Sequence, residues 1–379
     1  MNGSDAIMLD GETLDQFAAS VERYGQDKYG FEQYRALLRT APGFSQQAWS
    51  DYAGMGWLAA ARPLDDGGLD SHPVAVAALM RYAGEHLALE PLFANVVLCA
   101  RLLRLCGADP VARERLEALS AGQRLFALAH DEDLAAAAGG NVAAVWRDAA
   151  LHGRKVVVLH GDVADELIVS ARDGAGLSLF AVPVAQPAVR KSGYRLLDGR
   201  GAASFELAGA SARLIGPPGQ AGPLLEEALD GARLALCSEA HGAMRELNRQ
   251  TLAYLKERRQ FGRPIGANQA LQHRMVELFM LEQEVAAVIG AAQRATAAPA
   301  AQRRRAILGA AAHTMSAGRQ IAHEAVQMHG GIGTTDELAI SHYFKRIMVV
   351  NRLLGDRDAH MDAFARADAL DSAQPGASA

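Results

Sequence analysis

The 379-residue chain has 50% hydrophobic and 21% charged residues and a formal net charge of -5. This composition is typical of a globular protein long enough for two or three domains with substantial cores. A slightly acidic chain offers no dense basic patch, so we expect neither nucleic acid nor a membrane surface as a partner. The three cysteines, without a CxxC pair, argue against a disulfide framework or a zinc site, and we expect no metal.

The beginning of the chain shows no targeting signal. Met1 to Asp10 lacks the basic and apolar regions of a signal peptide. The sequence contains no apolar run near the roughly 20 residues that a transmembrane helix needs. We therefore expect a soluble, cytoplasmic protein.

The N-terminal part of the chain, to about residue 120, has the periodicity of helices. Apolar residues such as Leu14 and Val21 recur at helical spacing. The Leu- and Ala-rich run 74–106 predicts a helix pair broken near Glu90-Pro91. Asp109-Pro110 predicts the start of a short helix, because proline suits the first turn.

Short, often β-branched runs begin near Gln123 and are separated by Gly, Asp and Asn. Their spacing predicts a small antiparallel barrel or sandwich that ends at the Gly/Pro cluster 216–219. The expected strands are 125–129, 143–146, 155–159, 166–169 and 177–182.

Long Ala-rich helical segments follow, which favours close packing in a bundle. They cover 223–257, 268–295, 301–329 and 339–354. We therefore predict an α+β fold, without a parallel doubly wound sheet. The predicted parts are an N-terminal α-helical domain (1–120), a central β-domain (121–219), a C-terminal four-helix bundle (220–370) and a frayed tail (371–379).

The connection between the first two long helices gathers unusual residues. Arg258 leaves the first helix, Phe261 and Gly262 turn the chain, and Asn268 is placed to cap the next helix, just before Gln269. A guanidinium, an aromatic ring and a helix start would suit a phosphate and a ring system. A plain helix hairpin with solvated arginines is the structural alternative.

A second turn follows the third long helix, at Gln327-Met328-His329-Gly330-Gly331. The two glycines can take positive φ and leave the backbone bare for a ligand, and the amide of Gln327 can read a purine edge. An ordinary glycine cap at the end of a helix is the alternative.

These two motifs, in this order, resemble the acyl-CoA dehydrogenase family. The motifs are Arg-x-Gln-Phe-Gly with Pro-Ile-Gly and Gln, and then Gln-x-x-Gly-Gly. The succession of helices, β-domain and long helices extends the resemblance over nearly the whole chain. Two local stretches, 155–162 and 342–346, are similar to the small subunits of pimeloyl-CoA dehydrogenases.

The resemblance implies FAD as the cofactor, an acyl-CoA as the substrate and an electron-transfer flavoprotein as a partner. In the family the residues of the Arg-x-x-Phe-Gly motif reach across a dimer interface to the flavin diphosphate and adenine, so the protein would be an oligomer. By resemblance, the FAD-binding residues are Arg258, Phe261, Gln269, Gln327, Gly330 and Gly331. Asp230 and Arg233 match positions near the CoA thioester and adenosine, although a solvated surface pair is the alternative.

The catalytic base is missing from both places where the family carries a glutamate. One place lies nine residues past the arginine matched by Arg346, and this chain has Gly355 there; the other is Ala232. Asp356 could act as the base if the chain bends at Gly355, or it could simply cap the following helix. Glu239 is a further buried-carboxylate candidate, or a partner for neighbouring cations.

The flavin-ring positions also depart from the family pattern. Leu128-Ala129-His130 stands where a Thr or Ser is usual, and 157–159 is Val-Val-Leu in place of Trp-Ile-Thr. His130 or His160 could donate a hydrogen bond to the ring, or be structural.

These losses favour the small, base-lacking subunit of an α2β2 acyl-CoA dehydrogenase for a dicarboxylic or bulky acyl group, whose large subunit carries the glutamate. A self-sufficient homo-oligomer that uses Asp356, and a non-catalytic scaffold of the same fold, are the alternatives.

Overall fold

The computed structural model describes residues 11–133 and 142–372. The described residues form two compact units. Unit 1 combines the chain up to Leu79 with Leu89–Ala232, and unit 2 combines Met80–Ala88 with the chain from Arg233 onward. The three-domain division expected from the sequence stays a prediction. Met1 to Asp10, where we expect no targeting signal, lie outside the described residues, and so does most of the predicted tail 371–379.

Helices form the first part of the chain, as predicted. They are α1 (Gly11–Lys28), α2 (Phe31–Leu37), α3 (Gln46–Gly54), α4 (Pro73–Glu85), α5 (Ala100–Leu105) and α6 (Pro110–Ser120), with a π-helical segment at Phe93–Cys99. The predicted break at Glu90-Pro91 is confirmed, because it lies between α4 and the π-helical segment. Asp109 caps α6 through its side chain, which accepts from the Ala112 amide at 2.8 Å.

One eight-stranded sheet follows in unit 1, in the order β6-β7-β3-β2-β4-β5-β8, with β1 beside β4. Its strands are β1 (Phe126–Ala129), β2 (Val145–Arg147), β3 (Ala150–Leu159), β4 (Glu166–Asp173), β5 (Gly176–Pro183), β6 (Val189–Arg195), β7 (Gly201–Ala210) and β8 (Arg213–Ile215). The sequence had indicated only the first five.

The predicted β-domain is present, but its sheet is mixed instead of antiparallel throughout. β1 and β2 both pair with β4 in parallel, and the sheet is not closed into a barrel. A parallel pair needs a crossover, and neither periodicity nor turn residues show which strands a crossover joins. Apolar side chains from both β4 and β5, such as Val169 opposite Phe180, are buried in a core on this sheet.

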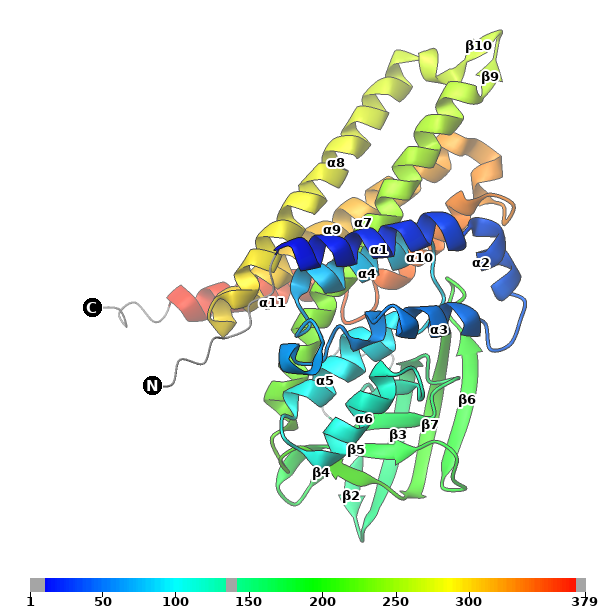
Figure 1. Ribbon diagram of the computed structural model, residues 1–379. Helices are drawn as coiled ribbons and strands as arrows, with labels where there is room; N and C mark the ends of the chain where they lie inside the picture. Colours follow the sequence, from blue (N-terminus) through cyan, green and yellow to red (C-terminus); the bar gives the residue numbers. More distant parts are fainter. Residues whose placement is uncertain (1–10, 134–141, 373–379) are drawn as a thin grey trace. The chain divides into compact units, whose positions relative to one another are not determined.

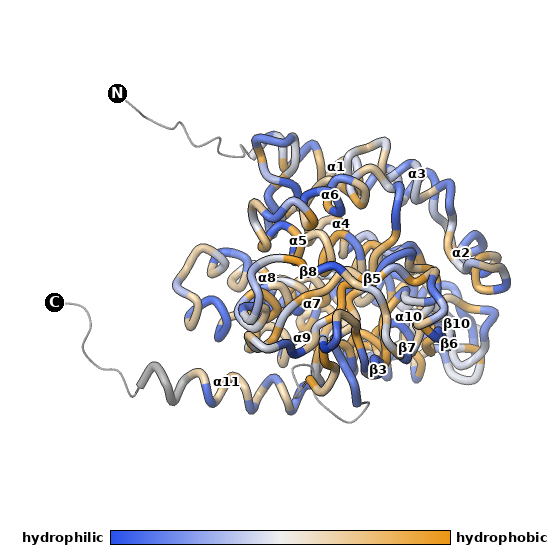
Figure 2. The backbone as a smooth tube through the Cα atoms, turned by 90° about the horizontal axis from the view of Figure 1, so that it is seen from below, coloured by the Kyte–Doolittle hydropathy of each residue, from blue (hydrophilic) through white to orange (hydrophobic). Residues whose placement is uncertain are grey.

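The four long helices are confirmed, with bounds within a few residues of the expected ones. They are α7 (Ala221–Glu257), α8 (Gln269–Arg294), α9 (Ala300–His329) and α10 (Ala339–Val350), followed by α11 (Arg357–Ser372). α9 packs against α8, α10 and α11 within unit 2. Hydrophilic and apolar residues alternate along α11 (Figure 2). In residues 11–133 and 142–372, none of the helices is both long and apolar enough to cross a bilayer.

Candidate functional site

A short hairpin joins α7 to α8 and carries the first motif. β9 (Arg259–Gln260) pairs antiparallel with β10 (Arg263–Pro264) at the far end of the two helices (Figure 1). Phe261 and Gly262 form its tip with φ of 50° and 82°, the left-handed values that a two-residue hairpin turn requires. A phenylalanine is rarely found there, and its ring is fully exposed. The hairpin therefore displays an aromatic side chain to its surroundings.

The predicted side-chain cap at Asn268 is wrong. Asn268 occupies the N-cap position of α8 with an extended backbone, but its side chain makes no capping hydrogen bond. Its Oδ1 accepts instead from Nη2 of Arg263 at 2.9 Å. Gly266 is required by close packing, since a Cβ there would lie 2.8 Å from the Leu255 carbonyl oxygen. The segment between α7 and α8 is thus stabilised by contacts among its own residues and with the end of α7.

The structure brings the second motif to the same end of α7. Tyr254, one turn before Arg258, stacks on His329 with ring centroids 4.3 Å apart, and its hydroxyl donates to the His329 carbonyl at 3.4 Å. His329 lies inside the Gln-x-x-Gly-Gly motif, directly before Gly330. The two motifs are therefore neighbours in unit 2, although 58 positions separate Gln269 from Gln327 in the sequence.

The second motif is also a helix cap, as the structural alternative proposed. Gly330, with φ of 68°, is the C-cap of α9, and its amide donates to the Gln327 and Val326 carbonyls. A Cβ built on Gly330 or Gly331 would meet no heavy atom of the described chain within 4 Å. The turn is thus open to a ligand or to another chain.

We call the residues of the two motifs the cofactor corner. All its side chains and glycines are exposed in the single chain. Its members are Arg258, Phe261, Gln269, Gln327, Gly330 and Gly331.

The proposed substrate residues are not a solvated surface pair. Asp230 is 5% exposed and Arg233 is 9% exposed, and both lie on α7. Burial of a carboxylate and a guanidinium is costly unless each is used in a polar network or by a ligand. Their burial therefore removes the alternative that the sequence had left open.

Asp356 acts as a helix cap. Its Oδ1 accepts from the Ala359 amide at 3.0 Å, and its Oδ2 accepts from Nη1 of Arg352 at 3.1 Å. The Ala359 hydrogen bond first, and then the Arg352 charge, lower the pKa of this carboxyl below its usual value. A carboxylate with these partners is a weak proton acceptor, so the geometry favours capping of α11 over catalysis.

Glu239 has a partner that the sequence analysis missed. It is fully buried, and its Oε1 accepts from Nη1 of Arg346 at 3.0 Å. Arg346 also donates to the carbonyls of Ala83, Leu87 and Ala88, at 3.1–3.3 Å. This pair therefore fixes the segment around the end of α4 within unit 2. Arg346 is distant in sequence from all four partners, and no local pattern could indicate the contact.

The two histidines proposed for the flavin ring are held by unit 1 itself. Nδ1 of His130 lies 2.8 Å from Ser170 Oγ, and burial, followed by the Lys155 charge, lowers the pKa of His130 to about 4. His160 is 3% exposed, with its backbone at a φ of 55°. The Ser170 contact supports a structural role for the His130 ring, and burial supports one for the His160 ring.

The strand at the missing Trp-Ile-Thr positions is strained. Val157 has a φ of 49°, which is a genuine outlier for a β-branched residue, and the β3–β7 register shifts between Lys155 and Val158. The Val157 amide donates to the hydroxyl of Tyr194 at 3.1 Å. Such outliers concentrate at functional sites, so the bulge marks this strand as a candidate part of the site.

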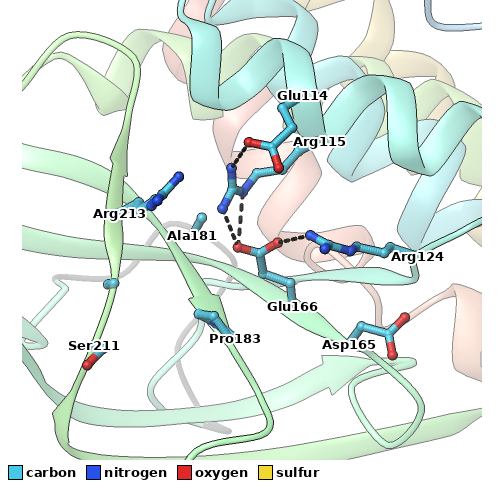
Figure 3. A pocket seen from close by; sticks show the side chains of 10 residues that line it. Glu114, Arg115, Arg124, Asp165, Glu166, Ala181, Pro183, Ser211 and Arg213 are labelled. Atoms are coloured by element: carbon cyan, nitrogen blue, oxygen red, sulfur yellow. Dashed lines mark hydrogen bonds and ion pairs between the residues drawn. The ribbon is translucent and has the colours of Figure 1, made fainter.

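A hollow of about 520 Å³ in unit 1 lies beside α6 and the ends of β4, β5 and β8. Arg115 donates to Glu166 at 2.7 Å, and Arg124 lies 3.9 Å from the same carboxylate (Figure 3). Glu114 and Arg213 also line the hollow. Because the charges compensate each other and the central pair is buried, this network is better explained as stabilising the contact of α6 with the sheet.

Comparisons with known proteins show similarity to acyl-CoA dehydrogenases. The family model "Acyl-CoA dehydrogenase, C-terminal domain" matches residues 222–368. Acyl-CoA dehydrogenase IpdE2 of Mycolicibacterium smegmatis is 28% identical over 89% of this chain and 92% of its own length.

Solved structures extend the similarity to the whole fold. The Tcur3481-Tcur3483 steroid ACAD G363A variant is 27% identical, with a TM-score of 0.86 over 96% of this chain and 99% of that chain. The ChsE4-ChsE5 complex from Mycobacterium tuberculosis is similar in fold, with a TM-score of 0.84, 23% identity, and coverage of 97% and 99%.

The fold, the two motifs in their order and these relatives are all similar to acyl-CoA dehydrogenases, and residues 222–368 match the C-terminal domain of that family. These similarities support an oxidoreductase that uses FAD. The cofactor corner fits that group chemically: it combines a guanidinium for a diphosphate, two amides for a purine edge and bare glycine backbone for close approach.

Proposed function

We propose that this chain is the small, base-lacking subunit of a heteromeric FAD-dependent acyl-CoA dehydrogenase. The observation that carries the proposal is the combination of an intact cofactor corner with Gly355 and Ala232 at the family's base positions. Asp356, the nearest carboxylate in sequence, is engaged as a helix cap. The glutamate would then come from a large subunit in an α2β2 assembly.

In this assembly the cofactor corner serves FAD that a neighbouring chain houses. The guanidinium of Arg258 would bind the diphosphate, and Phe261, fully exposed in the single chain, would be covered at the interface. Gln269 and Gln327 would hydrogen-bond the adenylate end, which passes over Gly330 and Gly331. Bound FAD supplies the hydride acceptor of the reaction.

The substrate belongs to the acyl-CoA thioesters, and we propose a bulky or dicarboxylic acyl group. The buried Asp230 and Arg233 are the polar groups of this chain that we place on the substrate side. Two solved structures with a similar fold support this proposal. Each is named for a pair of proteins, and the name of one pair includes steroid ACAD. The resemblance to pimeloyl-CoA dehydrogenase small subunits favours a dicarboxylic acyl group. An electron-transfer flavoprotein would reoxidise the flavin, and we expect the complex in the cytoplasm.

The test is flavin stoichiometry. The chain made alone should carry little FAD and show no acyl-CoA-dependent bleaching of the flavin. Co-expression with a glutamate-bearing family member from the same genome should give a yellow, active complex of both chains. A yellow and fully active assembly of this chain alone would refute the proposal.

The corner is tested by a matched pair of variants in the complex. Arg258→Ala should lower the FAD content severalfold, whereas Arg259→Ala, next to it and also exposed, should not. Equal FAD content in both variants would remove Arg258 from the cofactor site.

A further inference from the structure

A buried imidazole lies beside Gly355. His360, in the first turns of α11, is 2% exposed. Its Nε2 is closed to solvent and has no hydrogen-bond partner among the residues that the structure describes. A buried polar atom without a partner costs free energy, so its persistence calls for an explanation.

The imidazole stands where a side chain at position 355 would begin. A Cβ built on Gly355 would lie 3.1 Å from Cε1 of His360 and 3.6 Å from both ring nitrogens. Gly355 also has a φ of 109°, a conformation that favours glycine. A carboxylate at 355 and the imidazole at 360 therefore compete for the same space.

The electrostatics around the ring oppose its protonation. Burial is the main cause that lowers the pKa of His360 to about 4, and the charge of Arg233 lowers it further. The Asp356 carboxylate and a hydrogen bond with the Gly355 backbone act in the opposite direction and do not restore the usual value. The ring is therefore neutral near pH 7.

The position of Arg233 links the imidazole to both of the family's base positions. Arg233 directly follows Ala232 in the chain, and its charge acts on the ring that faces Gly355. A guanidinium beside a carboxylate keeps that carboxylate ionised. Beside an imidazole, the same guanidinium opposes the protonated form that abstraction of the α-proton would create.

We infer that His360 fills the place of the missing carboxylate as a neutral, solvent-closed side chain, so that this chain's own half-site cannot accept the α-proton of an acyl-CoA. By half-site we mean the place formed here by Gly355, His360 and Arg233. The inference rests on the proposed function, because it explains why the base would have to come from the partner chain.

The first experiment measures each histidine of the co-expressed wild-type complex by hydrogen–deuterium exchange at Cε1, read by mass spectrometry. His273, exposed on α8, is the matched control within the same unit. We expect His360 to exchange at least tenfold more slowly than His273, without an inflection between pH 5 and 8. Fast exchange with an inflection near pH 6.5 would overturn the inference.

The second experiment opens the half-site. In the complex, His360→Gly should create a hollow beside Arg233 that binds formate or acetate saturably, seen as a rise in Tm that neutral formamide does not produce. Adding Arg233→Gln should abolish the rise. A folded His360→Gly complex that does not respond to either anion would contradict the assignment.

The third experiment tests whether His360 only occupies space or acts as a catalytic base. His360→Gln should leave turnover of the complex within twofold of wild type. A loss of 100-fold or more at unchanged Tm would make His360 a base and overturn the inference. The proposed function fails separately, if the wild-type chain alone is flavinylated and active.

Discussion

The buried pair Glu239–Arg346 permits a quantitative prediction. Both side chains are fully buried and 3.0 Å apart, and Arg346 also satisfies three backbone carbonyls. Glu239→Gln keeps the size and one acceptor but leaves a buried guanidinium without its counter-charge. Breaking a buried pair in this way costs about 3–5 kcal/mol in the free energy of unfolding.

The matched control is an exposed pair. Arg190 and Glu206 lie 3.0 Å apart, but their side chains are 80% and 59% exposed. Glu206→Gln should therefore cost less than about 1 kcal/mol, because water screens such a pair. Urea unfolding of the co-expressed complex, followed by circular dichroism, compares the two variants at equal protein concentration.

The outcome can refute the reasoning directly. If Glu239→Gln destabilises the complex no more than Glu206→Gln, the negative charge of Glu239 is not needed to stabilise the buried guanidinium of Arg346. The flavin content of Glu239→Gln should follow its folded fraction, because the pair positions the end of α4 and is not part of the cofactor corner. Loss of FAD from fully folded protein would assign Glu239 a different role.

Three further predictions concern the side chains of Asp356 and His360. Asp356→Asn should leave turnover of the complex within twofold, whereas Asp356→Ala should destabilise α11 by about 0.5–2 kcal/mol, the usual cost of a lost N-cap. A large loss of turnover in Asp356→Asn would instead support the self-sufficient alternative. The pKa of Asp356 is lower in the folded state than in the unfolded state. The stabilisation by its charge is therefore fully present above the unfolded pKa and is lost as the pH falls through the folded pKa. The free-energy cost of Asp356→Ala should therefore shrink in strong acid. The pKa of His360 is about 4 when folded and 6.5 when unfolded, so the unfolded chain binds more protons between these values. Stability should then fall on acidification from pH 6.5 to 4, and His360→Gln should flatten that part of a Tm-against-pH curve; an unchanged slope would contradict the shift.

The local chemistry of the cofactor corner is visible in the sequence. Phe261-Gly262 between two long helices predicts a turn, and Gly330-Gly331 after a third predicts an open cap, because turns and caps are set by residues a few positions apart. The four long helices follow from periodicity in the same way. What the sequence leaves open is that Tyr254 and His329 stack, which makes the two motifs neighbours.

Other assignments depend on contacts that sequence spacing does not encode. The burial of Asp230 and Arg233 excludes a solvated pair, and the hydrogen bonds of Asp356 favour a cap over a base. The parallel pairing of β1 with β4 was missed because alternation along a strand is similar in parallel and antiparallel neighbours.

The sequence by itself determined the order of the helical and β segments and the absence of a carboxylate at Gly355 and Ala232. It also showed the two motifs that we propose to bind FAD. All of these are readable from residues close together in the chain. Only the tertiary structure decided the partner of Glu239 and the packing of His360 against Gly355. The physical reason is that burial and charge pairing depend on which distant segments fold against each other, and an ionisable side chain takes its role from those neighbours.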